Sequence, residues 1–411
     1  MSLSRPETGS VGRAAFLTHT PPLPLVSGER IRNWSLMHEL AARGWKVSLF
    51  SLLHAETSPS FAERAEMEEI CEEVVLEPFA ISSIERKVRV ARDLLLGRAF
   101  QSSYFYSSEC ANTCRRWLAE REFDVIVIET HYMIPYTPSE LLARAVFDSH
   151  NSETRRVSTM ASTLGFSARG LAARLQRGAV GRLERSIVTQ AARTLAVSEE
   201  EVKALEPFAP GRIDLVPNGV DCERLKSRST VPDTAEILFL GSLDYSANVD
   251  ALAYFVDSIS PFVRRGDATL SVVGSHPRDE VYEIAKRSTL TMTVSGNVLD
   301  TTPYWERARA LVVPLRVGGG TRLKILEALA RGVPVITTSL GCEGLGLRDG
   351  QDVLVADDAE NFAACVDRLL ADDDLCRSLS VHGRAVVEAR FNWRIIGDAF
   401  ESSLSSVIHG A

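Results

Sequence analysis

The chain has 411 residues, of which 45% are hydrophobic and 24% are charged. This composition is typical of a globular protein, and the length suits two domains of roughly 200 residues each. The net charge of −8 argues against a general nucleic-acid binder. The seven cysteines are scattered, and the sequence has neither a signal-peptide pattern nor a membrane-spanning apolar run. We therefore expect a soluble cytoplasmic protein with free thiols and no metal site.

Short apolar segments alternate with helical patterns through the first half of the chain. A strand is expected at Ala14–Thr18, followed by a helix at Ile31–Arg43, which Gly44 ends. This alternation is typical of a parallel sheet with helices on both faces. Further strands are expected at Val47–Leu53, Glu73–Leu76, Asp124–Glu129, Ala145–Asp148, Thr194–Val197 and Ile213–Val216.

The second half repeats the same alternation. The polar segment 222–235 is predicted to be a linker between a first domain, 1–221, and a second domain, 236–391. The fold class is therefore α/β, with two Rossmann-like doubly wound domains whose ligand cleft lies at the carboxyl ends of their strands. The strands of the second domain are expected at Glu236–Gly241, Thr269–Gly274, Leu290–Ser295, Ala310–Leu315, Val333–Thr337 and Asp352–Val355.

The clearest functional pattern is a glycine loop between a strand and a helix, at 318–320. Backbone N–H groups and the helix dipole at such a turn can hold an anion. Arg322 and Lys324 oppose the dipole of the helix expected at Thr321–Ala330, so their charge indicates a diphosphate, with a sugar or ribose hydroxyl near Glu327. The alternative is a close helix–sheet turn with a solvated basic edge. The candidate binding residues here are Gly319, Gly320, Thr321, Arg322, Lys324 and Glu327.

Several motifs occur together, in order, along nearly the whole chain. They are RGWKV at 43–47, LAVSEEE at 195–201, VPNGVD at 216–221, FLGSLDYSANVDAL at 239–252, VVG at 272–274 and GGGTRLKILEALARGVPVITT at 318–338. With them the chain resembles the group 1 (family 4) retaining glycosyltransferases of the GT-B type, in particular the subgroup with the GGGTRLK signature. The resemblance implies two domains facing a central cleft, and a terminal helix, 392–411, that packs back on the first domain.

The resemblance also implies the reaction and its substrates. A sugar would pass from a nucleotide-diphosphate sugar, without any further cofactor, to a hydroxyl of a polysaccharide, a lipid-linked glycan or a secondary metabolite. Gly28, Gly241 and Gly274 would lie in donor-binding loops. Two departures stand out: Gly319 replaces the first of two characteristic glutamates, and GSLDYSAN lacks the usual Arg and Lys. We infer that Arg322 and Lys324 supply the missing charge, so that no divalent metal is required.

The acceptor would then bind to the first domain. Glu129 and His131 follow one expected strand, and Asp148 and His150 follow the next. Polar, titratable groups beyond two neighbouring strand ends suit hydroxyl recognition, so Glu129, His131 and His150 join Arg322 and Lys324 as candidate catalytic residues. Alternatively, both histidines only cap strands, and Gly28 is a simple turn glycine.

The segment 154–185 carries seven arginines against one glutamate. It predicts either a solvated helical face or a basic surface for an anionic substrate or the inner membrane surface. Two other functions stay open: a sugar-nucleotide epimerase of the same fold, and a non-catalytic sugar-nucleotide binder. A dehydrogenase is disfavoured because no expected strand opens into G-x-G-x-x-G. The oligomeric state is expected to be a monomer or a homodimer.

Overall fold

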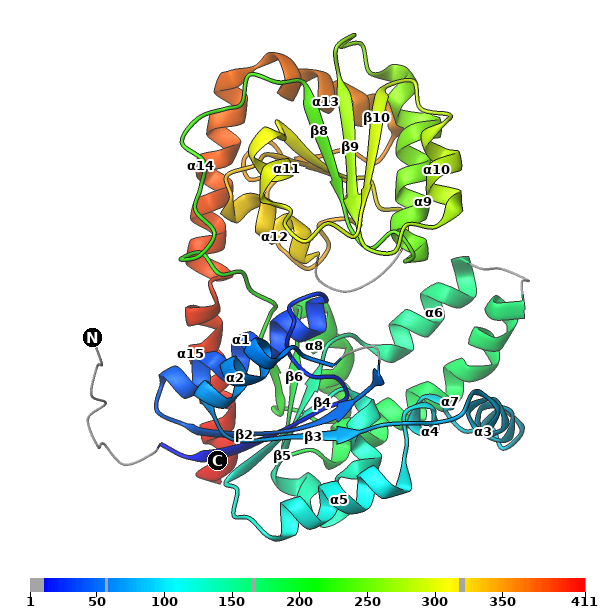
Figure 1. The fold of residues 1–411 in the computed structure, drawn as a ribbon, viewed down its shortest axis with the longest axis vertical. Coiled ribbons are helices and arrows are strands. Elements are labelled where there is room, and N and C mark those ends of the chain that lie inside the picture. Colours follow the sequence, from blue (N-terminus) through cyan, green and yellow to red (C-terminus); the bar gives the residue numbers. More distant parts are fainter. Residues whose placement is uncertain (1–10, 56–57, 164–167, 318–321, 411) are drawn as a thin grey trace. The chain divides into compact units, whose positions relative to one another are not determined.

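The computed structural model describes residues 11–55, 58–163, 168–317 and 322–410. The chain forms two compact units, one made of Met1–Pro217 with Ile396–Ala411, the other of Asn218–Ile395 (Figure 1). Each unit has a parallel sheet packed between helices, so the predicted α/β class is confirmed. Within the described ranges, we find no helix long and apolar enough to cross a lipid bilayer.

The first unit is built on a seven-stranded sheet with the order β3-β2-β1-β4-β5-β6-β7. All its neighbouring strands are parallel. Parallel strands covered on both faces appear in sequence as continuous apolar runs, which is why they were predicted with small errors at their ends. The strands are β1 (Arg13–Thr18), β2 (Lys46–Leu53), β3 (Cys71–Pro78), β4 (Val125–Glu129), β5 (Ala145–Ser149), β6 (Arg193–Ala196) and β7 (Ile213–Leu215).

Helices cover both faces of this sheet. Leu17 of β1 packs in a core cluster with Trp117 of α5, whereas its neighbour Phe16 contacts Phe400 of α15 at 6.1 Å between ring centroids. Because adjacent strand residues point to opposite faces, α5 and α15 lie on opposite sides of the sheet. The helical elements are α1 (Gly28–Ala42), α2 (Phe61–Ile70), α3 (Ser83–Leu95), α4 (Gln101–Tyr104), α5 (Ser108–Ala119), η2 (His131–Tyr136), η3 (Ser139–Arg144), α6 (Glu153–Thr163), α7 (Ala168–Gln190), α8 (Glu199–Leu205), η4 (Glu206–Phe208) and α15 (Trp393–Ile408).

The second unit has a six-stranded parallel sheet with the order β10-β9-β8-β11-β12-β13. Its core joins the apolar strands to the inner faces of α9, α12 and α13. The strands are β8 (Glu236–Leu240), β9 (Thr269–Gly274), β10 (Thr291–Gly296), β11 (Ala310–Val313), β12 (Val335–Thr337) and β13 (Leu354–Val355). The helical elements are α9 (Ser246–Tyr254), η5 (Phe255–Ile259), η6 (Ser260–Phe262), α10 (Asp279–Ala285), α11 (Thr302–Arg307), α12 (Leu323–Ala330), α13 (Ala359–Ala371) and α14 (Asp373–Arg390).

The segment 222–235, predicted as a linker, instead packs on the second unit. Cys222 is buried in the core of that unit, and the Arg228 guanidinium donates to the carbonyl oxygens of Ala308 at 2.6 Å and Arg309 at 3.2 Å. The polar composition of this segment suggested a free linker. Instead, hydrogen bonds from arginine side chains to backbone carbonyls attach it to the second unit. The boundary expected after residue 221 likewise lies after Pro217.

The end of the chain belongs to the first unit from Ile396 onward. Besides the contact of Phe400 with β1, the Trp45 indole donates to Glu401 Oε1 at 2.8 Å. Arg43, just after α1, pairs with Asp398 at 2.7 Å. Apolar and charged contacts thus attach α15 to the first sheet and to the end of α1.

Candidate functional site

Each sheet has one point at which its strand order reverses. In the first sheet this point lies between β1 and β4, and in the second sheet between β8 and β11. Residues beyond the carboxyl ends of these strands border a topological switch point, where open α/β sheets bind ligands. The two switch points are therefore the candidate sites, and each is described within its own unit.

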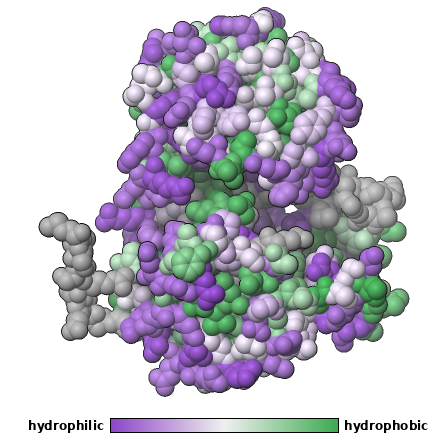
Figure 2. Space-filling view, in the orientation of Figure 1, coloured by the Kyte–Doolittle hydropathy of each residue, from purple (hydrophilic) through white to green (hydrophobic). Residues whose placement is uncertain are grey.

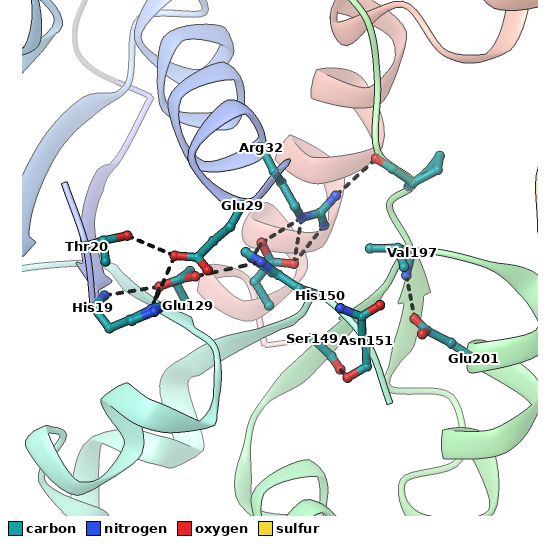
Figure 3. A network of polar contacts seen from close by, with 12 residues as sticks. His19, Thr20, Glu29, Arg32, Glu129, Ser149, His150, Asn151, Val197 and Glu201 are labelled. Atoms are coloured by element: carbon teal, nitrogen blue, oxygen red, sulfur yellow. Dashed lines mark hydrogen bonds and ion pairs between the residues drawn. The ribbon is translucent and has the colours of Figure 1, made fainter. Parts of the chain in front are cut away.

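His19 and Glu129 meet at the switch point of the first sheet (Figure 3). His19 directly follows β1, and Glu129 is the last residue of β4. Glu129 Oε2 accepts a hydrogen bond from the His19 backbone N–H at 3.1 Å and lies 3.0 Å from His19 Nδ1. Glu29, in the first turn of α1, places its Oε1 3.3 Å from the same Nδ1, and the Thr20 hydroxyl donates to that carboxylate at 3.0 Å.

Burial and charge compete in setting the protonation of this cluster. Burial by itself would lower the pKa of His19, but the carboxylates of Glu29 and Glu129 outweigh it and raise the pKa to about 9. Burial would raise the pKa of Glu129, yet His19 and His150 lower it to about 2. Burial and the neighbouring Glu129 raise the pKa of Glu29. His19 is therefore a cation at neutral pH, held by at least one ionised glutamate.

A second ion pair adjoins this cluster at the end of β5. The guanidinium of Arg32, from α1, is buried against Asp148, with 2.9 Å from Nε to Oδ2 and 2.7 Å from Nη2 to Oδ1. Burial opposes ionisation of Asp148, but Arg32 and then His150 hold the pKa of this carboxyl well below its usual range. His150 links the two groups, because its Nε2 lies 3.3 Å from Asp148 Oδ2 and its Nδ1 lies 3.7 Å from Glu129 Oε1.

The backbone between Glu129 and His131 is strained. Thr130 has φ 57° and ψ 162°, a conformation that is essentially confined to glycine and is unfavourable for a β-branched residue. The turn directs His131 into the protein, where burial lowers the pKa of its imidazole to about 4. His131 is therefore neutral at physiological pH. For His150, burial by itself would lower the pKa, but Asp148 and Glu129 outweigh burial and raise it.

A cavity of about 30 Å³ opens beside these two histidines. Its polar lining includes His131, His150, Asn151, Glu153 and Glu184, and apolar residues of β5 and α7 complete it. This volume has room for water but not for a sugar. The structure thus brings the predicted residues Glu129, His131 and His150 together at one end of the sheet, with Asp148, Arg32 and His19 beside them.

Glycines shape the switch point of the second sheet. A Cβ at Gly274, the last residue of β9, would lie 1.8 Å from the carbonyl oxygen of Gly241, which follows β8. A Cβ at Gly241 would lie 2.7 Å from Lys324 Nζ and 2.7 Å from Asn248 Nδ2. Gly274 thus allows close packing of two loops, and Gly241 leaves room for the lysine.

Lys324 lies in the first turn of α12 and reaches this point. Its ammonium donates to Asn248 Oδ1 at 3.0 Å and lies 5.5 Å from the ring centroid of Phe239. Burial and the neighbouring cation Arg322 lower the pKa of Lys324 to about 7. The surrounding protein thus disfavours the charged form of Lys324. An anion placed beside Nζ would favour that charged form.

Arg322 differs from the position expected for it, whereas Glu327 lies in the predicted helix. Helix α12 begins at Leu323, so Arg322, with φ −86° and ψ 81°, is its N-cap residue instead of part of its first turn. Burial lowers the pKa of Arg322. The Glu327 carboxylate accepts a hydrogen bond from Arg331 Nε at 3.1 Å, one turn further along α12, and burial raises its pKa.

The remaining predicted binding residues have other positions. Gly28 is not in a loop but is the first residue of α1, where it is exposed beside the N-cap Ser27. The prediction of a loop at Gly28 was wrong because the helix begins directly after its N-cap residue Ser27, three residues before the apolar periodicity starts at Ile31. Gly319, Gly320 and Thr321 lie outside the described residues.

Sequence reasoning missed Glu29, Thr130 and Asn248. An acidic residue in the first turn of a helix is common for dipole reasons alone, so Glu29 gave no separate signal. The backbone angles of Thr130 cannot be read from sequence. His19, Glu29 and Glu129 also place ligand atoms within 4.8 Å of one another, a spacing compatible with a metal ion that scattered sequence positions did not reveal.

Comparisons with known proteins agree with this architecture. The family described as "Glycosyltransferase Family 4" matches residues 27–224, and "Glycosyl transferases group 1" matches residues 234–372. A glycogen synthase of Mycobacterium tuberculosis is 29% identical over 208 residues, which are 47% of this chain and 49% of that protein. The chain thus spans about half the length of this curated relative.

Solved structures share the fold over nearly the whole chain. Sucrose-phosphate synthase from Thermosynechococcus elongatus has a TM-score of 0.71 at 19% identity, covering 97% of this chain and 100% of the other. HepE from Anabaena, solved in complex with UDP-glucose, has a TM-score of 0.62 at 14% identity, covering 96% and 100%. The two family matches and the fold define a two-domain GT-B glycosyltransferase. The chain belongs to the group 1 glycosyltransferases, as its resemblance predicted.

Proposed function

We propose that the protein is a retaining glycosyltransferase that moves a hexosyl group from a nucleoside-diphosphate sugar to a hydroxyl acceptor. The observation that carries the donor assignment is Lys324, whose ammonium reaches the switch point of the second sheet with a pKa of about 7. A diphosphate leaving group develops negative charge as the sugar is released, and a fixed cation stabilises that charge. UDP-glucose in the HepE structure supports a uridine donor of this class.

The acceptor is assigned to the first unit. His131 is held neutral, and His150 is held close to Asp148 and Glu129 beside the small cavity. A neutral imidazole can accept a proton, whereas ionised carboxylates can accept hydrogen bonds from sugar hydroxyls. Glu327 is proposed to contact the donor ribose, which requires its carboxylate to exchange Arg331 for a hydroxyl partner.

Transfer is proposed to be independent of divalent metal, because Arg322 and Lys324 supply charge at the donor side. The cluster of His19, Glu29 and Glu129 is better explained as an ion-paired network, since His19 is itself the cation between two carboxylates. The family matches favour sugar transfer over the epimerase and over the non-catalytic binder. A monomer or homodimer in the cytoplasm stays a proposal, as does the GGGTRLK subgroup.

The test is incubation of the purified protein with a panel of nucleoside-diphosphate sugars. In the absence of an acceptor, a glycosyltransferase releases nucleoside diphosphate slowly. We therefore expect nucleoside diphosphate as the product from one donor of the panel, and EDTA should leave the rate of its release unchanged. Release of an epimerised sugar nucleotide, or binding with no product under any condition, would refute transfer. Loss of the product in EDTA and its recovery with Mg²⁺ or Mn²⁺ would refute metal independence and point to the His19 cluster.

A further inference from the structure

The outer face of α3 is apolar although it is exposed to solvent. Ile84, Val88 and Leu95 are 74%, 61% and 87% exposed. Their spacing of four and seven residues places them, with Ala91, on a single stripe of the helix. A surface helix that served only the fold would turn such a stripe toward the core, so this exposed stripe requires another explanation.

Charged side chains attach the opposite face of α3 to the protein. Asp93 is buried and accepts a hydrogen bond from the Ser103 hydroxyl. The Arg86 guanidinium lies 4.8 Å from the centroid of the Tyr104 ring, and Arg89 donates to the backbone carbonyl of Tyr106. The helix is thus oriented by its polar residues, and its apolar stripe is directed outward.

The start of α7 continues this surface. The segment that follows α3 is tied to α7, because Gln176 accepts from the Phe100 N–H at 3.2 Å and donates to the Arg98 carbonyl at 3.1 Å. Leu171 and Leu175 of α7 are exposed one turn apart. Figure 2 shows apolar and hydrophilic residues side by side at this end of the first unit, where Figure 1 places α3 and α7.

Cations surround the apolar residues. Lys87 and Arg92 are exposed and lie on either side of the stripe of α3, as their helical positions require. The exposed cations of the neighbouring segment are Arg98, Arg174 and Arg177. Such a concentration of positive charge contrasts with the net charge of −8 for the whole chain.

We propose that α3 and the start of α7 dock on the surface of an anionic lipid bilayer. Ile84, Val88 and Leu95 enter the boundary between headgroups and acyl chains, and the surrounding lysine and arginines reach lipid phosphates with their long side chains. A partner protein would also cover the apolar stripe, but cations on both of its sides fit the anionic headgroups that border an apolar membrane interior. This surface refines the predicted role of the arginine-rich segment 154–185 by adding an apolar anchor outside it.

The experiment is co-flotation of the full chain with vesicles of phosphatidylcholine, with and without phosphatidylglycerol. The apolar variant carries Ile84→Asn, Val88→Asn and Leu95→Asn, and the charge variant carries Lys87→Gln, Arg98→Gln and Arg177→Gln. The matched control, Phe61→Asn with Leu299→Asn and Val381→Asn, removes three apolar side chains elsewhere that are also more than half exposed. Far-UV circular dichroism and thermal melting establish that each variant is folded.

We expect wild type and control to float with anionic vesicles at low salt. The apolar variant should lose at least about a hundredfold in partitioning, and the charge variant about a hundredfold on anionic vesicles only. Wild type that stays in solution, or an apolar variant that floats like wild type, would overturn the proposal. Self-association that the apolar variant abolishes, without lipid binding, would assign the stripe to a second copy. Nucleoside-diphosphate binding is measured separately, so loss of flotation leaves the proposed sugar transfer untouched.

Discussion

Replacement of Lys324 tests the donor site most directly. Lys324→Met keeps the apolar length of the side chain and removes the charge that lies beside Gly241 and Asn248. A charge-assisted hydrogen bond to phosphate contributes about 1.5–3 kcal/mol. The variant should therefore bind nucleoside diphosphate about tenfold or more weakly, while its binding of the unphosphorylated nucleoside changes little.

The pH dependence of this binding provides a second, sharper readout. With a pKa of about 7, Lys324 in the free protein is roughly one-quarter charged at pH 7.5 and about 1% charged at pH 9. If the diphosphate binds only the charged form, its apparent dissociation constant rises about twentyfold across this interval. The phosphates are already ionised there, because their last pKa is about 6. In Lys324→Met this rise should be absent.

Folding stability should change in the opposite direction. The pKa of Lys324 is about 10.5 in the unfolded chain and about 7 in the folded one, so the unfolded state binds more protons between these values. The free energy of unfolding of the ligand-free protein should therefore rise with pH across that window, and Lys324→Met should be the more stable protein at pH 7.

The assay is isothermal titration calorimetry of nucleoside diphosphate at several pH values, with chemical unfolding in parallel. Lys286→Ala is the matched control, because it removes one exposed lysine from the same unit, where Lys286 pairs with Glu283 at 2.6 Å. If Lys324→Met binds the diphosphate within twofold of wild type, or keeps the wild-type pH slope, the donor charge does not come from Lys324.

The other predictions concern the first unit. In Glu129→Gln the pKa of His19 should fall from about 9 toward 6.5, measured by NMR of the imidazole. The stability that His19 contributes is complete below pH 6.5 and lost as pH rises through 9, so wild type should lose about 3 kcal/mol over that interval and the variant far less. Arg32→Met leaves the Asp148 carboxylate buried without its guanidinium and should cost about 3–5 kcal/mol in urea unfolding, and a cost below 1 kcal/mol would contradict the buried pair. Thr130→Gly should relieve backbone strain and so raise the free energy of unfolding by about 1 kcal/mol. The same variant should transfer sugar more slowly. If the turn is not strained, the glycine variant should instead be less stable than wild type.

The strands could be predicted because the sheets are parallel and their central strands are buried on both faces. Thr269–Gly274 was predicted with the bounds that β9 has, since Leu270, Val272 and Val273 form a short, largely apolar segment between polar turns. The segment 222–235 could not be assigned in the same way. What attaches it is a set of arginine contacts to backbone carbonyls, and those partners are 80 or more residues away in sequence.

The site was predictable only in part, for a related reason. Glu129 and His150 could be placed because residues at strand ends gather at one edge of a parallel sheet. Which side chains meet depends on register, here the pairing of Leu17 with Ile128, which puts His19 one residue beyond the position level with Glu129. Sequence order does not give that pairing. The outward-facing stripe of α3 was missed because a helical repeat of apolar residues normally predicts a buried face, and its orientation is decided by Asp93 and its partners.

The two switch points have the same strand order but opposite electrostatics. At the first, the cations His19 and Arg32 each lie against a carboxylate, so their charge is compensated without a ligand. At the second, Lys324 has a neutral amide as its hydrogen-bond partner and a cation as its charged neighbour. A balanced network suits a neutral substrate whose hydroxyls exchange hydrogen bonds, whereas an uncompensated buried cation suits an anion that restores its charge. This difference in charge is the reason why we propose that the sugar hydroxyl binds to the first unit and the diphosphate to the second.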